Sequence, residues 1–216
     1  WETVAGGLTG KVEGTNFTDS LIVGHSTTGT LSSALRNTAV GIDALDAITQ
    51  GDGNSVLGMS AGTAITTGSF NTYIGEKAGI TNSGASGNTG VGRYALYYQT
   101  GADNTVVGNA AMVGNGAYEH NTAIGASALG AVTTGDYNVG LGKQAGDNLT
   151  TGSGNILIGT GDFAAIDSAR TLKIVSYDGS TTTNHIIGDS NGVLTFNTAN
   201  VTQQALTSSS NAVAWD

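Results

Sequence analysis

Residues Asn121–Tyr137 read NTAIGASALGAVTTGDY, and variants of this stretch recur along most of the chain. The glycine that closes the first five residues returns after 17 residues in seven of eight intervals and after 16 in the other. These glycines are Gly24, Gly41, Gly58, Gly75, Gly92, Gly108, Gly125, Gly142 and Gly159. Such a fixed period is typical of a stack of near-identical units and not of a fold around one irregular core.

The composition narrows the classes of protein and partner. The 216 residues include 35 glycines but no proline and no cysteine, so every residue keeps a backbone donor and no disulfide or cysteine-ligated metal is expected. The net charge of −9 argues against a nucleic-acid partner and against docking on an anionic membrane. No apolar run approaches the roughly 20 residues of a spanning helix, so we expect no membrane insertion. The start at Trp1 and the end at Asp216 suggest a piece of a longer chain.

The first half of each unit predicts a short strand. We number the places of a unit from its asparagine, which is place 0, so that place 3 in the quoted stretch is Ile124. Place 3 is aliphatic throughout, and we therefore predict that it points into the unit as a core column, with the threonines of place 1 on the same face. The predicted core column is Val40, Leu57, Ile74, Val91, Val107, Ile124, Leu141 and Ile158. Place 2 is uncharged and mostly apolar although it points the other way, which favours a second copy of the chain as its cover.

The second half of each unit predicts a corner. Alanine recurs at place 7 and is expected inside, whereas places 5 and 6 are freely polar or charged and are expected outside. A corner with a helical turn, a second short strand such as Ala131–Thr133 and a Thr-Gly turn would complete the unit. We thus predict an all-β fold: a parallel β-roll or solenoid of about eight 17-residue coils.

The place 0 asparagines are predicted to stack as a structural ladder, because side-chain amides can hydrogen-bond to one another and to the amides of tight corners. The ladder consists of Asn37, Asn54, Asn71, Asn88, Asn104, Asn121, Asn138 and Asn155.

The period ends after Gly159, which divides the chain. We predict an N-terminal lead-in or cap over residues 1–15, the repeat roll over 16–161 and a short helical cap over 162–170. Residues 171–216 are predicted to form a small β-meander connector followed by a Ser/Thr-rich linker.

Units such as NTAIGASALGAVTTGDYN and NTVVGNAAM resemble the Asn-Thr-Ala-aliphatic-Gly repeats of phage tail-fibre proteins and large bacterial surface fibres. They are also similar to the shorter Asn-Ser-x-Ala-Ile-Gly repeats in the heads of trimeric autotransporter adhesins. The resemblance covers roughly residues 16–160, and LTSSSNAVAWD at the end of the chain resembles tail-fibre segments. It implies a homotrimer, which agrees with an apolar place 2.

These features predict no enzyme and no cofactor. The three histidines lack the spacing of metal ligands, no nucleophile elbow is present, and the glycines lack the lysine and setting of a phosphate loop. Aromatic residues near the corners are instead candidates for surface recognition of a host glycan or protein, with packing into gaps or between chains as the competing interpretation. They are Tyr94, Tyr97, Tyr98, Tyr118 and Tyr137.

We therefore expect a structural protein: a segment of a trimeric phage tail fibre or similar appendage, on the virion tail or at the cell surface, that attaches to a host surface. A bacterial trimeric surface adhesin of the same architecture is the main alternative. An ice-binding solenoid is a third class, since threonine is abundant, but a threonine column that faces inward argues against it.

Overall fold

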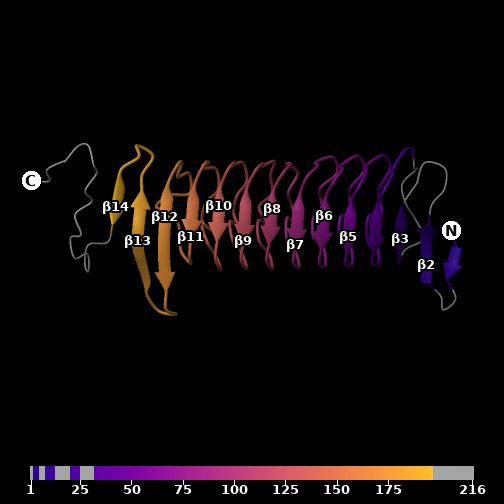
Figure 1. Cartoon of the computed structure of the whole chain (residues 1–216), viewed down its shortest axis with the longest axis horizontal. Helices are drawn as coiled ribbons and strands as arrows, with labels where there is room; N and C mark the ends of the chain where they lie inside the picture. Colours follow the sequence, from indigo (N-terminus) through magenta and orange to yellow (C-terminus); the bar gives the residue numbers. More distant parts are fainter. Residues whose placement is uncertain (1, 5–7, 13–19, 25–31, 197–216) are drawn as a thin grey trace, which may run out of the picture.

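The computed structural model describes residues 2–4, 8–12, 20–24 and 32–196. Its strands form a single sheet in chain order from β1 to β14, stacked along the long axis of a rod with β1 and β14 at opposite ends (Figure 1). Nine short strands carry the repeat: β3 (Leu21–Val23), β4 (Thr38–Val40), β5 (Ser55–Leu57), β6 (Thr72–Ile74), β7 (Thr89–Val91), β8 (Thr105–Val107), β9 (Thr122–Ile124), β10 (Val139–Leu141) and β11 (Ile156–Ile158). The fold is an all-β parallel solenoid of about nine turns, as the period predicts.

Neighbouring coils pair place for place. Strands β8 and β9 are parallel, with Thr105 opposite Thr122 and Val107 opposite Ile124. The same register holds across the 16-residue interval, where Thr89 faces Thr105. The strand of the coil that is one residue short therefore stays in register with its neighbours, and the coil is shorter only in its loops.

The strands alternate as predicted, but their inside and outside are the reverse of the prediction. The place 2 residue is the buried one in every repeat strand, whereas the predicted core column at place 3 lies outside. In β8, Val106 is 0% exposed and its neighbour Val107 is 38% exposed. Of the predicted core column, Val40, Leu57, Ile74, Val107, Ile124 and Ile158 are exposed and Val91 and Leu141 are half-buried. Place 2 therefore needs no partner chain to cover it.

The interior is narrow, which explains why it holds the smaller and more variable residues. In several coils a large side chain at place 2 faces a small one at place 8, or the reverse: Tyr73 faces Gly79, whereas Gly90 accompanies Leu96. A Cβ at Gly79 would lie 2.5 Å from the Tyr73 ring, and one at Gly90 would lie 3.3 Å from Leu96 Cδ1. The interior of these coils is thus filled by complementary sizes, as close packing requires.

The place 0 asparagines form a continuous buried ladder. The Asn121 Oδ1 accepts hydrogen bonds from the backbone N–H and from the Nδ2 of Asn138, at 2.9 and 3.1 Å. The Nδ2 of Asn121 in turn donates to the carbonyl of Gly135, which closes its own coil, at 3.0 Å. The same pattern joins Asn37 to Asn155, and Ser20 continues it at the first coil. The ladder satisfies buried polar groups that the tight return turn would leave without partners.

Outside its strand, each coil from residue 37 to residue 160 consists of turns and irregular backbone. The expected second strands, such as Ala131–Thr133, and the expected helical turn do not form. Single hydrogen bonds between coils replace them, for example from Thr133 N–H to the Thr150 carbonyl at 2.8 Å. Left-handed residues at places 6 and 8, such as Ser127 and Leu129, curve the corner too tightly for a strand or helix to continue.

The stack extends beyond the repeat at both ends. The predicted helical cap over 162–170 is wrong, because this segment contains no helix and leads into β12 (Leu172–Tyr177), which pairs in parallel with β11. The predicted meander then follows as β13 (Thr182–Gly188) and β14 (Leu194–Phe196), both antiparallel. At the other end, β1 (Glu2–Val4) and β2 (Leu8–Val12) are antiparallel. The predicted linker beyond residue 196 lies outside the described residues.

Candidate functional site

The outward sides of β3–β11 form one continuous surface, which we call the strand face. It consists of two columns, place 1 and place 3, and no residue of either column in these strands is charged or buried. Because parallel strands repeat about every 4.8 Å, nine of them give a surface on the order of 40 Å long and 10 Å wide. This surface of roughly 400 Å² carries no charge, and its place 3 column is a continuous aliphatic strip.

The two columns of the strand face differ in chemistry. Place 3 is aliphatic throughout, with Leu57 and Ile124 51% and 45% exposed. Place 1 carries hydroxyls in six consecutive coils, none of which hydrogen-bonds to another described residue: Thr38, Ser55, Thr72, Thr89, Thr105 and Thr122. A second threonine column elsewhere in the coil behaves differently, since Thr66 Oγ1 donates to the Ser83 carbonyl at 3.0 Å. The place 1 hydroxyls are therefore open to water or to a partner.

Aromatic residues gather at one corner of the 16-residue coil, and we call this group the aromatic corner: Glu76, Lys77, Arg93, Tyr94, Tyr97 and Tyr98. The rings of Tyr94 and Tyr97 meet edge to face at 5.2 Å between centroids, and those of Tyr97 and Tyr98 at 4.3 Å. Such contacts fix the orientation of the rings. Three of the five candidate recognition residues are thus brought together.

The other two candidate tyrosines lie apart from this group. Tyr118 is fully buried, and its hydroxyl donates to the carbonyls of Met112 and Gly114, so its assignment to surface recognition is wrong. It fills space inside a coil whose return turn departs from the repeat. Tyr137 is 63% exposed and stacks on His120, with the rings 4.8 Å apart and almost parallel.

Burial also acts on the interior tyrosines electrostatically. It raises the pKa of the Tyr73 hydroxyl far above its ordinary value, although hydrogen bonds from Asn82 and Asn88 oppose the shift. The pKa of Tyr118 is raised in the same way, chiefly by burial and further by the neighbouring Tyr73. Both phenols therefore stay neutral and serve packing.

Gln99 lies in the interior of the short coil. It occupies an interior position equivalent to Ile65 and Leu149 of other coils and is fully buried. Its Nε2 donates to the Gly101 carbonyl, whereas its Oε1 has no hydrogen-bond partner among the described residues. The interior of this coil thus holds Gln99, and the aromatic corner lies outside it.

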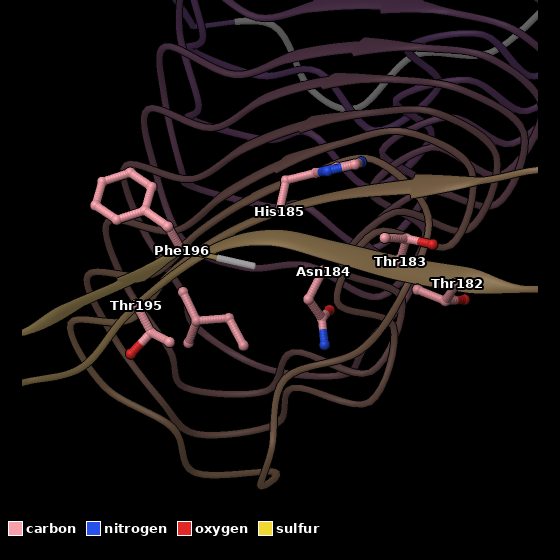
Figure 2. A pocket seen from close by; sticks show the side chains of 7 residues that line it. Thr182, Thr183, Asn184, His185, Thr195 and Phe196 are labelled. Carbon is pink, nitrogen blue, oxygen red and sulfur yellow. The ribbon is translucent and has the colours of Figure 1, made fainter. Parts of the chain in front are cut away.

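A hollow of about 390 Å³ lies over β13 and β14, and Figure 2 shows consecutive residues Asn184 and His185 projecting to opposite sides of β13. The hydroxyl of Ser176 lies 2.8 Å from His185 Nε2, and both residues are exposed. Within residues 32–196, no carboxylate is hydrogen-bonded to this histidine. The pair therefore lacks the third group that orients the base of a catalytic triad.

A second hollow, of about 280 Å³, brings Asp147 and Asp162 together beside Lys143. The pKa of Asp147 is raised, first by partial burial and then by its hydrogen bond to Asp162 and the charge there. No group of three or more potential metal-binding side chains occurs in the described part of the chain. Nor do those residues contain a helix long and apolar enough to cross a bilayer.

Comparison of the chain with known protein families, with curated proteins and with solved structures found no match. The case for a function therefore rests on the geometry of the strand face and of the aromatic corner.

Proposed function

We propose that this chain is a structural segment of a fibre, in which copies associate side by side through their strand faces and present their corners to a host surface. A phage tail fibre or a similar appendage, at the virion tail or outside the cell, is the setting that the repeat favours. The single observation that supports this proposal is the strand face: an uncharged, partly aliphatic surface along nine coils of a chain whose net charge is −9.

A second copy of the chain fits this surface for a geometric reason. An identical solenoid has the same rise per coil, so each aliphatic residue at place 3 meets an equivalent row along the whole length. A standard interface buries about 800 Å² per partner, roughly twice the area of the strand face. Flanking corners must therefore join the interface. We propose three chains, a homotrimer, because the repeat resembles those of trimeric fibres and adhesin heads.

A matched pair of substitutions tests the association. Ile124→Asp places a carboxylate on the strand face, whereas Thr134→Asp places one at an exposed position in the second half of the same coil, away from the strand face and the corner that follows it. We expect Ile124→Asp to lower the mass in solution to that of one chain, because like charges would face one another between copies, and Thr134→Asp to leave it unchanged. An unchanged mass in both variants would refute association through the strand face.

Ice binding is a second candidate, and one observation favours it. The place 1 hydroxyls, predicted to face inward, lie outward in six consecutive coils and in strict register, as an ordered hydroxyl array would require. The bulkier leucines and isoleucines of place 3 make the surface uneven, which favours protein packing instead. Measurement of thermal hysteresis in a solution of the full chain distinguishes the two candidates. We expect no hysteresis, whereas a freezing-point depression beyond the colligative value would establish ice binding.

A bacterial surface adhesin would use the same architecture and the same interface. The alternatives differ in what the fibre is attached to, so identification of the particle or cell envelope that carries the chain separates them.

A further inference from the structure

The three tyrosines of the aromatic corner, Tyr94, Tyr97 and Tyr98, do not fill the interior of their coil. Leu96 and Gln99 fill that interior and are both fully buried. Tyr98 is 46% exposed, and Tyr94 and Tyr97 are half-buried on the outer side of the corner. The fully buried Tyr73 and Tyr118 are the tyrosines that fill space inside. Filling of interior space therefore explains Tyr73 and Tyr118 but not the tyrosines of the aromatic corner.

Two of the chain's seven basic residues also lie at this corner. The Arg93 guanidinium lies 4.1 Å from the centre of the Tyr94 ring and the Lys77 ammonium 5.7 Å from it. Glu76 pairs with Arg93 at 3.1 Å, while Lys77 forms no ion pair with any described residue. A chain with a net charge of −9 thus carries a locally positive spot beside its exposed rings.

We propose that the aromatic corner binds an acidic oligosaccharide. The C–H face of a pyranose ring stacks on the exposed Tyr98 ring, and a sugar carboxylate pairs with Lys77, whose ammonium lies beside the Tyr94 ring. Because Tyr98 contacts Tyr97 and Tyr97 contacts Tyr94, the group offers more than one ring to an oligosaccharide.

The chemistry of the corner favours a saccharide over other anions. Aromatic rings that combine an apolar face with a hydroxyl suit ligands that alternate C–H and O–H groups. The Tyr94 hydroxyl accepts a hydrogen bond from Arg93 Nη2 at 2.8 Å, so this part of the surface is preorganised before a ligand arrives. Arg93 and Tyr98 are exposed, so each copy binds weakly and several copies in one fibre provide avidity.

This inference rests on the proposed attachment function and names its ligand class. The test is titration of the full chain with three acidic oligosaccharides, sialyllactose, trigalacturonate and a chondroitin disaccharide, with lactose as the neutral counterpart. We expect at least one acidic oligosaccharide to bind more tightly than lactose by about tenfold, and this difference to shrink as salt is raised. Equal or absent binding of all four probes would overturn the proposal.

Two variants and two controls locate the site. Tyr98→Ala and Lys77→Gln are each expected to weaken acidic-glycan binding by about tenfold. Tyr137→Ala removes another exposed tyrosine, and Lys143→Gln another lysine on the same edge of the rod; both are expected to leave binding unchanged. Equal loss in the controls would place the site elsewhere and refute the assignment. Unchanged thermal melting of all four variants shows that the rod is intact.

Measurement of the mass in solution alongside glycan binding tests the glycan site and the association of chains separately. An assembled chain that binds no acidic glycan would refute the glycan site alone, whereas a single chain that binds one would refute the association alone. If Tyr98→Ala lowers the mass and leaves binding unchanged, the tyrosines pack between chains, and the glycan site is wrong.

Discussion

Val106 and Val107 permit a direct test of which side of the strand is the interior. They are adjacent in β8, chemically identical, and 0% and 38% exposed. Val106→Asp removes a buried side chain worth about 2 kcal/mol and buries a carboxyl group at a cost of several kcal/mol. The expected loss is therefore roughly 5 kcal/mol or more, comparable to the whole stability of many domains. In Val107→Asp the carboxylate reaches water when the chain is alone, so the loss is about 1 kcal/mol when both variants are compared as single chains at high dilution.

Circular dichroism during heating measures this difference. In a chain of this size 1 kcal/mol shifts the melting temperature by about 2–4 °C, so Val106→Asp should melt at least 10 °C lower or not fold, and Val107→Asp within a few degrees. In the Val106→Asp variant, burial would raise the pKa of the introduced carboxyl above its unfolded value, so the variant should regain stability as the pH falls and lose it as the pH rises. Equal loss of the β-sheet spectrum in both variants would refute a chain with its own interior.

Three further predictions concern the interior. Asn121→Ala should cost roughly 3 kcal/mol in chemical denaturation, because it leaves the backbone N–H of Asn138 buried without a partner; a loss below 1 kcal/mol would contradict the role of the ladder. Gly79→Ala should cost about 3 kcal/mol, since its φ is +60° and its Cβ would overlap the Tyr73 ring, and most of the steric part should vanish in a Tyr73→Ala background; additive losses would contradict this contact. In an alkaline titration followed by ultraviolet absorbance, Tyr73 and Tyr118 should ionise only as the chain unfolds. Their folded pKa values are raised, so the stability they contribute is complete below pH 10 and is lost as the pH rises further; ionisation of all seven tyrosines in the folded chain would contradict their burial.

The period and the alternation of the strands could be predicted from the sequence, because every coil must pair with the next in the same register. Which side of each strand faces the interior could not be predicted from hydrophobicity, since place 3 is more consistently aliphatic than place 2. A second signal was present in the sizes: Ala39 accompanies Leu45, Tyr73 accompanies Gly79 and Gly90 accompanies Leu96. Only residues that share a confined space need such compensation, and this pattern would have identified place 2 as the interior.

The aromatic corner was only partly predictable. The run Tyr94-Ala-Leu-Tyr-Tyr98 marks the irregular coil, but separating its exposed tyrosines from the buried Tyr118 requires the path of the loops. The contribution of Lys77 comes from the preceding coil, 17 residues before Tyr94, and follows from the stack rather than from local sequence. The missing second strand has a similar origin, since left-handed residues at the corners are not evident from residue types such as leucine and serine.

The measurement that tests the central proposal most directly is the mass of the unmodified chain by light scattering over a wide range of dilution. Association through the strand face into a homotrimer predicts three times the 21.5 kDa of one chain, with dissociation only at high dilution or in the Ile124→Asp variant. A mass of 21.5 kDa at every concentration would contradict it.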